Sequence, residues 1–383
     1  MALRNRYLNC GLASGNNDGT TEADAWRTFA DCESGVEAGD VVWCRTVDGN
    51  RVTGEANMLF DSPASAPTID APIALIGYSS TPGDGGMFKW GHYFYNRERW
   101  VLVEGFDVEQ SSSSPSMRSD GDGSVFYRCK IVNNTASFNG ALYMTDGTAI
   151  NCSVSANLAG AGKVVRLFRG TLIDSYINAT AASSGGDLFV EANISFRPSV
   201  ISGCIIDGTQ SSGDVGISID GDSANYGCWI SNNTIYNVGN AIEFEDGAGT
   251  NMTQIMVTQN NVIYNATNGI INSRGTNTSS VLGHFVNNNA MGSISSAAYT
   301  NIQDEYIKNK VTLTADPFVD KIDFELNDAP GGGALCKFLG APPRQYDPTL
   351  LGTTFANDRD SGRRNFASIG AVGAKGAESS HVF

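Results

Sequence analysis

The sequence of 383 residues has little positive charge, three histidines and no long apolar run. Its 25 Lys and Arg face 40 Asp and Glu, so the formal net charge is -15. A chain this acidic repels the phosphates of nucleic acids and the surface of anionic membranes. No segment approaches the roughly 20 apolar residues of a membrane-spanning helix, and the N-terminal segment lacks the apolar core of a secretion signal. We therefore expect no nucleic acid and no membrane among its partners.

The sequence also lacks the spacings that hold metals. Its eight cysteines form no C-x-x-C pair, and several occupy apolar positions of expected strands, so we predict buried, reduced thiols. DGDG at residues 120–123 and IDGDS at 219–223 are similar to fragments of calcium loops. The distal bidentate Glu of such loops is missing, so corner turns are expected there. We predict no metal and no other cofactor.

What the sequence does contain is a repeat. SNNTIYN at residues 231–237 returns as QNNVIYN at 259–265, a shift of 28 residues. The same frame recurs at intervals of 23, 23, 23, 29, 30, 28 and 28 residues, at Phe106, Cys129, Cys152, Ser175, Cys204, Thr234, Val262 and Ala290. A second series, with intervals of 23, 23, 29, 25 and 28 residues, begins its copies at Gly140, Lys163, Gly186, Val215, Asn240 and Asn268.

Each repeat is a short β-rich run with period-two alternation, and no amphipathic stretch of helix length separates the runs. This excludes helical repeats. Coils of about 20–30 residues with polar corners indicate a β-solenoid, in which coils stack about 4.8 Å apart. Asn and Asp suit the corners because they tolerate left-handed backbone angles. Stacked Asn side chains can also hydrogen-bond from coil to coil.

The two ends of the chain differ from the repeats. Residues 7–45 contain a strand, a polar loop, a short helix around Ala25–Cys32 and the strand AGDVVWCR; the C-terminal part contains DPFVDKIDFELNDAPGGGALCKFLGAP and NDRDSGRRNFASIGAVGA. These segments resemble the opening and closing segments of right-handed parallel β-helix proteins of phage virions. The resemblance implies an all-β fold, a single-stranded right-handed parallel β-helix over residues 41–315. It also implies an N-terminal cap with a short helix at 1–40 and a C-terminal cap at 316–383.

The same resemblance suggests two classes of function. The fold group includes polysaccharide lyases and hydrolases, phage tailspikes and phage capsid-stabilising proteins. A missing export signal favours a virion protein that is made in the host cytoplasm and released by lysis. A tailspike has a virion-binding domain before its β-helix, whereas here the opening segment begins at Tyr7. We predict a capsid-stabilising (decoration) protein, a homotrimer on the phage major capsid protein. The alternative is a tailspike or other polysaccharide-degrading enzyme, a glycoside hydrolase or lyase, acting on host surface polysaccharide.

One group of acids qualifies as a catalytic site if the protein is an enzyme. Alignment of the second series places Glu191, Asp220 and Glu245 in one outward column, with Glu243 beside the last and Arg166 nearby. Neighbours in such a column lie about 5 Å apart, as in retaining glycosidases, and like charges this close raise one pKa. Solvated acids that only add to the net charge are the other interpretation, under which there is no catalytic residue.

The alignment also predicts which side chains form the core. Ile217, Ile242 and Phe244 are expected to point inward. The outward apolar residues are expected to form the trimer contact, and they are Tyr143, Phe168, Phe189 and Ile271. The aromatic segment FKWGHYFYNRERW at residues 88–100 has three open interpretations: a sugar platform, a subunit contact or an early core strand.

Overall fold

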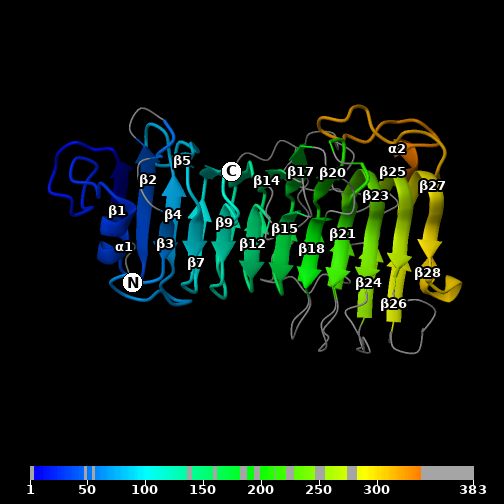
Figure 1. Ribbon diagram of the computed structural model, residues 1–383, viewed down its shortest axis with the longest axis horizontal. Helices are drawn as coiled ribbons and strands as arrows, with labels where there is room; N and C mark the ends of the chain where they lie inside the picture. The colour runs from blue at the N-terminus through cyan, green and yellow to red at the C-terminus, as the bar shows by residue number, and fades with distance from the viewer. Residues whose placement is uncertain are drawn as a thin grey trace. The chain divides into compact units, whose positions relative to one another are not determined.

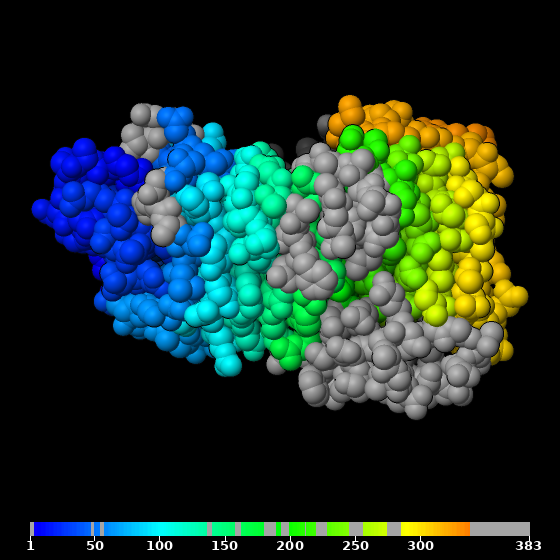
Figure 2. Space-filling model, viewed as in Figure 1, coloured from blue at the N-terminus to red at the C-terminus, as the bar shows by residue number. Residues whose placement is uncertain are grey.

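The computed structural model describes residues 4–46, 50–53, 57–135, 140–157, 162–181, 188–193, 199–210, 212–220, 228–245, 255–273 and 283–337. The fold is all-β with long parallel sheets (Figure 1), as the sequence predicts. It divides into two compact units, Met1–Thr171 and Leu172–Phe383. In each unit the coils follow one another as bands in chain order (Figure 2). Among the described residues, no helix is long and apolar enough to cross a membrane.

The first unit opens with a strand, a helix and a strand. β1 (Arg4–Cys10) pairs in parallel with β2 (Asp40–Thr46), and α1 (Phe29–Gly35) lies between them in the chain. The predicted helix around Ala25–Cys32 is present, but it begins four residues later than expected, at Phe29, and ends at Gly35. Trp26 is extended instead, because its N–H donates to the carbonyl oxygen of Tyr7 at 2.9 Å. The helix begins after Thr28, whose side chain accepts from the backbone N–H of Asp31 and caps it.

The coil that begins with β2 contributes two described strands, and each of the next four coils of the first unit contributes three short strands, one to each of three parallel rows. The first row continues from β2 through β4 (Ile73–Gly77), β7 (Val101–Glu104), β10 (Val125–Tyr127) and β13 (Thr148–Ile150). The second comprises β5 (Phe88–Trp90), β8 (Phe106–Gln110), β11 (Lys130–Asn133) and β14 (Ser153–Asn157). The third comprises β3 (Met58–Phe60), β6 (Phe94–Asn96), β9 (Met117–Ser119), β12 (Leu142–Thr145) and β15 (Lys163–Phe168).

The second unit is also built of parallel rows, but β23 (Thr234–Glu245) pairs with both β20 (Ile205–Asp207) and β21 (Val215–Asp220), so one long strand replaces two short ones. One row consists of β19 (Ser199–Ser202), β22 (Cys228–Ser231), β24 (Ile255–Gln259), β26 (Gly283–Asn287) and β28 (Ile307–Lys308). The other sides of the coils are β17 (Tyr176–Ala181), β18 (Leu188–Asn193), β20 (Ile205–Asp207), β21 (Val215–Asp220), β23 (Thr234–Glu245), β25 (Val262–Asn272), β27 (Ala290–Thr300) and β29 (Val311–Leu313). The remaining elements are β16 (Thr171–Ile173), η3 (Asp304–Tyr306) and α2 (Gly333–Cys336).

The interior of the coils is apolar. Ile217, Ile242 and Phe244 are buried, which confirms the predicted inward phase of their strands. All eight cysteines are buried thiols, as predicted. In the first unit stacked aromatic rings fill the core: the ring centres of Phe88 and Phe106 lie 5.0 Å apart. Burial of these side chains is the main favourable term in forming a coil that cannot fold alone.

The repeat marks a corner with left-handed backbone. In the second unit this corner is occupied by Asn232, Asn260 and Asn288, with φ of 58°, 55° and 57°. Asn tolerates this conformation better than other residues with a Cβ. The side-chain Nδ2 of Asn260 donates to Oδ1 of Asn232 at 3.2 Å, and Nδ2 of Asn288 donates to Oδ1 of Asn260 at 3.1 Å. The corner thus hydrogen-bonds from coil to coil, as expected from the sequence.

The residue after this corner points inward and forms a second ladder. Asn261 Nδ2 donates to Oδ1 of Asn289 at 2.8 Å and to the carbonyl oxygen of Ile230 at 3.1 Å. Its own Oδ1 accepts from the backbone N–H of Asn233 at 3.0 Å. Cys204 occupies the same position one coil earlier, since its N–H donates to Oδ1 of Asn233. Asn233 and Asn261 are completely buried, so these hydrogen bonds satisfy polar groups that water does not reach.

This ladder corrects one step of the predicted repeat. Thr234 pairs with Ile205 rather than with Cys204, so the expected frame is one residue out at this coil. The steps from Thr234 to Val262 and from Val262 to Ala290 are confirmed. The error arose because Cys204 and Ile205 are both apolar, and the apolar pattern alone does not separate them.

The described part of the C-terminal segment packs along the coils of the second unit (Figure 1). Phe318, Phe324 and Leu326 are buried in one cluster with Val262 and Ala290. The centre of the Phe318 ring also lies 6.2 Å from that of Tyr236 and 6.4 Å from that of Tyr264. Residues 338–383 lie outside the described residues. The predicted N- and C-terminal caps and the right-handed sense of the coil stay predictions.

The buried ladder makes the first testable prediction. Replacement of Asn261 by Leu keeps the volume but leaves hydrogen-bonding groups of Asn233, Asn289 and Ile230 without their partner. We expect Asn261→Leu to lower the free energy of unfolding by at least about 2 kcal/mol, measured by urea denaturation. Thr267→Ala, at an exposed position of the same strand, is the control and should change it by less than about 0.5 kcal/mol. Equal, small losses in both variants would show that the ladder is not stabilising.

Candidate functional site

The outward side chains of four strands in the first unit form a row. Tyr95 on β6 lies beside Arg118 on β9, Arg118 lies beside Tyr143 on β12, and Tyr143 lies beside Arg166 on β15. The residue before each of them points inward and is completely buried: Phe94, Met117, Leu142 and Val165. Strand alternation therefore directs Tyr95, Arg118, Tyr143 and Arg166 away from the core, where Arg118, Tyr143 and Arg166 are partly exposed and Tyr95 is 8% exposed beneath its neighbours. We call these four residues the Tyr–Arg row.

Aromatic rings and guanidinium groups alternate along this row and contact one another. The Cζ of Arg118 lies 4.6 Å from the ring centre of Tyr95 and 4.7 Å from that of Tyr143. The Cζ of Arg166 lies 4.7 Å from the ring centre of Phe168 and 5.8 Å from that of Tyr143. Attraction between a cation and the face of a ring stabilises such pairs by about 0.5–1 kcal/mol each at exposed sites. The row is thus held in place by its own contacts.

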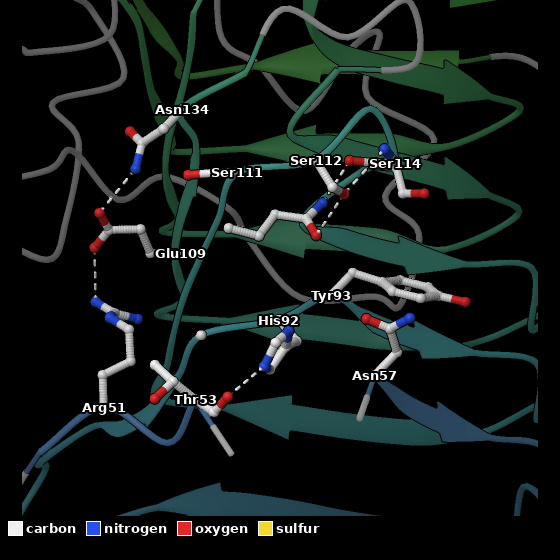
Figure 3. A pocket seen from close by; sticks show the side chains of 12 residues that line it. Arg51, Thr53, Asn57, His92, Tyr93, Glu109, Ser111, Ser112, Ser114 and Asn134 are labelled. Carbon is white, nitrogen blue, oxygen red and sulfur yellow. Dashed lines mark hydrogen bonds and ion pairs between the residues drawn. The ribbon is translucent and has the colours of Figure 1, made fainter. Parts of the chain in front are cut away.

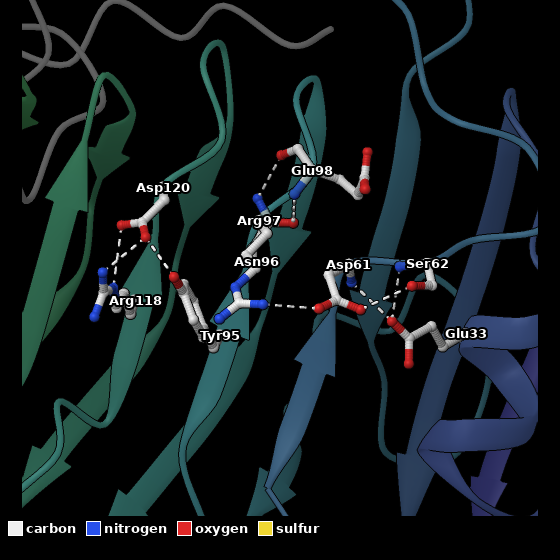
Figure 4. A network of polar contacts seen from close by, with 9 residues as sticks. All are labelled: Glu33, Asp61, Ser62, Tyr95, Asn96, Arg97, Glu98, Arg118 and Asp120. Atoms are coloured by element: carbon white, nitrogen blue, oxygen red, sulfur yellow. Dashed lines mark hydrogen bonds and ion pairs between the residues drawn. The ribbon is translucent and has the colours of Figure 1, made fainter.

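A carboxylate fixes one end of the row (Figure 4). Asp120 accepts from Nε of Arg118 at 3.1 Å and from Nη2 of Arg118 at 2.7 Å. The hydroxyl groups of Tyr95 and Thr145 also donate to Asp120. A planar guanidinium bound at two points to one carboxylate has a defined orientation. Asp120 therefore positions both Tyr95 and Arg118.

The pKa values of this group follow from these contacts. Burial raises the pKa of Asp120, but the hydrogen bonds from Arg118 and Tyr95 outweigh it, and the pKa lies below its ordinary value. Burial and the hydrogen bond to Asp120 raise the pKa of Tyr95. At neutral pH the carboxylate is therefore ionised and the phenol is a donor.

A second group of acids lies next to Tyr95 (Figure 4). Nη1 of Arg97 lies 3.1 Å from Oδ2 of Asp61, and the Cζ of Arg97 lies 4.7 Å from the ring centre of Tyr95. Glu33 accepts from the backbone N–H of Asp61 at 2.7 Å. Burial raises the pKa of Glu98, and the negative charges of Asp61 and Glu33 raise it further. A general acid requires a shift in this direction.

The predicted acid column is not in register. Glu191 pairs with Ser218, whereas Asp220 pairs with Asn193 on one side and with Glu245 on the other. The prediction that Glu191 and Asp220 share a row is therefore wrong by two residues. A shift of two residues keeps every side chain on its face, so the period-two pattern of the sequence does not reveal it. Asp220 and Glu245 do lie on neighbouring strands, as predicted.

The other predicted site residues do not form a single group of acids, although Glu191 and Glu243 pair with Ser218 from its two sides. Glu191 is buried, with 5% of its surface exposed. Glu243 accepts from Nδ2 of Asn240 at 2.7 Å and from the hydroxyl of Ser273. The side chains of Asp220 and Glu245 lie outside the description, and Arg166 belongs to the Tyr–Arg row of the first unit. In the described part of the chain, no group of three or more His, Cys, Asp or Glu side chains is arranged to hold a metal.

One predicted outward residue is also misplaced. Phe189 is completely buried, so it does not offer apolar surface to a partner subunit. Both Phe189 and its neighbour Val190 are buried, so this strand does not alternate in the simple way that the prediction assumed. Tyr143, Phe168 and Ile271 are only partly buried, as expected.

Sequence reasoning missed the Tyr–Arg row, although a signal for it exists. Its four residues are 23, 25 and 23 positions apart, close to the intervals of the second repeat series. That series begins at Gly140 in the sequence analysis, and the strands of Tyr95 and Arg118 precede it. If the series is continued toward the N-terminus, Tyr95 of the aromatic segment aligns with Arg118, Tyr143 and Arg166.

Comparison with known proteins supports the fold. No family model matches the sequence, and no curated protein matches it. Among solved structures, the crystal structure of pectate lyase Pel9A is similar, with a TM-score of 0.51 and 12% sequence identity. The similarity covers 98% of this chain and 97% of that chain. At this identity it concerns the fold alone, and it identifies the chain as a parallel β-helix.

The contacts of Asp120 generate a prediction with a pH dependence. Its pKa is lowered from 3.8, so the ionised carboxylate stabilises the fold above that pH, and the contribution is lost as the pH falls through the lowered pKa. We expect Asp120→Asn to lower the free energy of unfolding at pH 7 by about 1–2 kcal/mol, because the side chain is partly exposed. The difference from the wild type should shrink below pH 3.8, as measured by urea denaturation.

The control is Asp70→Asn at an exposed position, which should leave the free energy of unfolding unchanged both at pH 7 and below pH 3.8. A loss in Asp120→Asn that is the same at both pH values would contradict the role given to its charge.

Proposed function

We propose that the protein binds an anionic polysaccharide along the Tyr–Arg row. The observation that carries the proposal is the alternation of ring and guanidinium over four successive coils. Aromatic rings present flat apolar faces to sugar rings, and guanidinium groups donate paired hydrogen bonds to carboxylates. The row brings both kinds of group together. The rings of Tyr95 and Tyr143 already contact guanidinium groups, however, and Arg118 is bound at two points to Asp120. A ligand would therefore contact the outer edge of the row.

Charges of both signs gather around the row. Arg97, Arg118 and Arg166 contribute guanidinium groups, whereas Asp61 and Asp120 are their neighbours and Glu33 and Glu98 lie beside Asp61. The acids therefore offset the guanidinium groups. In this proposal a ligand carboxylate is held by direct hydrogen bonds from guanidinium groups and not by a net positive charge of the surface.

The length of the row supports a polymer rather than a small metabolite. Four coils at the ordinary strand spacing of about 4.8 Å extend over about 14 Å. The groups of the row lie on strands, which hold side chains more rigidly than loops. A rigid line of like contacts suits an extended chain of repeating units. The similar fold of an enzyme named pectate lyase also supports a polysaccharide as the ligand class.

The other roles predicted from the sequence remain proposals, and we rank them below polysaccharide binding. They are the capsid-stabilising function, the homotrimer, the contact with a major capsid protein and the location in the virion. Tyr143 and Phe168, which the sequence analysis gave to the trimer contact, belong to the proposed ligand surface instead, since Arg166 lies against both rings. Cleavage of the bound polysaccharide, the alternative predicted from the sequence, is compatible with binding along this row.

Binding is tested with polygalacturonate as the anionic probe and dextran as the neutral one. We expect polygalacturonate to bind with an affinity that falls as salt is added, because exposed charges are screened. Tyr143→Ala and Arg118→Gln should each weaken binding at least about tenfold in calorimetric titration, which corresponds to about 1.4 kcal/mol. Arg99→Gln removes one positive charge at an exposed position outside the row and is the matched control.

Equal affinity for both polymers would contradict the proposal, as would Tyr143→Ala and Arg118→Gln variants that fold and bind like the wild type.

The same mixtures are assayed for reducing ends. Binding alone leaves their number constant, whereas cleavage raises it and assigns the protein to the polysaccharide-degrading enzymes. In that case Asp220→Asn tests whether the predicted acid pair takes part.

A further inference from the structure

A second candidate site lies in a pocket of about 610 Å³ in the first unit (Figure 3). Its volume falls within the range of about 300–1,000 Å³ that is usual for small-molecule sites. The lining comes from described residues before β3, the turn before β6, the end of β8 and the segments that follow β8 and β11. The lining residues are Arg51, Thr53, Asn57, Gly91, His92, Tyr93, Glu109, Gln110, Ser111, Ser112, Ser114 and Asn134.

The charges that line this pocket cancel. Nη2 of Arg51 lies 3.0 Å from Oε2 of Glu109 and 2.9 Å from Oδ1 of Asp107. Its Nη1 donates to the carbonyl oxygens of Trp90 at 2.8 Å and Asp107 at 2.7 Å. Glu109 also accepts from Nδ2 of Asn134 at 2.9 Å. The guanidinium and the carboxylate in the lining thus satisfy each other, and the pocket does not select for a charged ligand.

The polar wall around Gln110 is held by internal hydrogen bonds. Gln110 is 5% exposed, donates to the carbonyl oxygen of Ser114 and accepts from Oγ of Ser112 at 3.0 Å. Nδ2 of Asn133 donates to the same carbonyl at 2.9 Å. Nε2 of His92 lies 2.9 Å from the carbonyl oxygen of Thr53 and links the opposite wall. A wall fixed in this way loses little conformational entropy when a ligand binds.

Tyr93 and Asn57 complete the pocket. They lie at one side of it, and Arg51 with Glu109 lies at the other (Figure 3). Tyr93 presents a partly buried ring, and Asn57 presents an exposed amide on the neighbouring coil. The amide both donates and accepts hydrogen bonds, as do the hydroxyls of Tyr93, Ser111 and Thr53. A flat ring among neutral groups of this kind complements a molecule with one apolar face and many hydroxyls.

We propose that this pocket binds a short neutral saccharide. The proposal goes beyond the binding of an anionic polymer, since it requires neither Arg118 nor Arg166. The pocket nevertheless adjoins the Tyr–Arg row, because the ring centres of Tyr93 and Tyr95 lie 6.1 Å apart. Polymer and short saccharide therefore have neighbouring but separate contacts.

The test is saturation-transfer NMR on the full chain, with cellobiose, xylobiose and galactobiose as neutral probes and galacturonate as the charged one. We expect transfer to at least one neutral disaccharide and at least about tenfold weaker transfer to galacturonate. Tyr93→Ala and Asn57→Ala should each reduce the signal at least about tenfold, and Tyr93→Phe, which keeps the ring, should reduce it less. Arg99→Gln, at an exposed position outside both the pocket and the row, should leave the signal unchanged.

Absence of transfer to all three neutral disaccharides would overturn the proposal. A signal that survives in both Tyr93→Ala and Asn57→Ala would also overturn it, because the sugar would then bind elsewhere. Thermal melting of each variant separates lost binding from lost folding, and Tyr93→Phe provides a reading if Tyr93→Ala does not fold. The two proposals fail separately. If no neutral disaccharide binds but polygalacturonate binding still depends on Arg118, only the pocket proposal is overturned. If a neutral disaccharide binds in the pocket but polygalacturonate does not bind, only the proposal for the Tyr–Arg row is overturned.

Discussion

Parallel hydrogen bonding between successive coils is the interaction on which the other features of this protein depend. It places each residue beside the equivalent residue of the next coil, as Thr234 beside Val262 and Val262 beside Ala290. Inward positions then stack apolar side chains, and corner positions stack Asn on Asn. Outward positions form rows of surface groups at the strand spacing of about 4.8 Å. The same register thus builds the core and arranges the surface.

This constraint has a chemical consequence for any row of side chains. Equal charges stacked at strand spacing repel one another, whereas a guanidinium between two rings is stabilised. Arg118 has Tyr95 on one side and Tyr143 on the other, and Asp120 fixes its orientation at two points. Such a row is rigid before a ligand arrives, which reduces the entropy lost on binding. A parallel β-helix therefore presents ordered rows of side chains that suit linear ligands.

The sequence was sufficient for the fold class and for most of the inward phase, because apolar alternation and corner Asn residues repeat visibly. It was not sufficient for register. Glu191 is displaced by two residues from Asp220, and Cys204 by one residue from Thr234, since neither shift changes the apolar pattern enough to be detected. The Tyr–Arg row was missed for a related reason. Its members alternate in chemistry from coil to coil, so a search for one repeated residue type does not find them.

We propose that coil register creates a linear binding row on the first unit. The most direct test is the affinity of the protein for purified galacturonate oligomers of increasing length, measured by calorimetric titration at fixed ionic strength. We expect the affinity to rise with each added sugar and to level off once the oligomer covers the four coils from Tyr95 to Arg166, about 14 Å. An affinity that is independent of length from the shortest oligomer upward would contradict it.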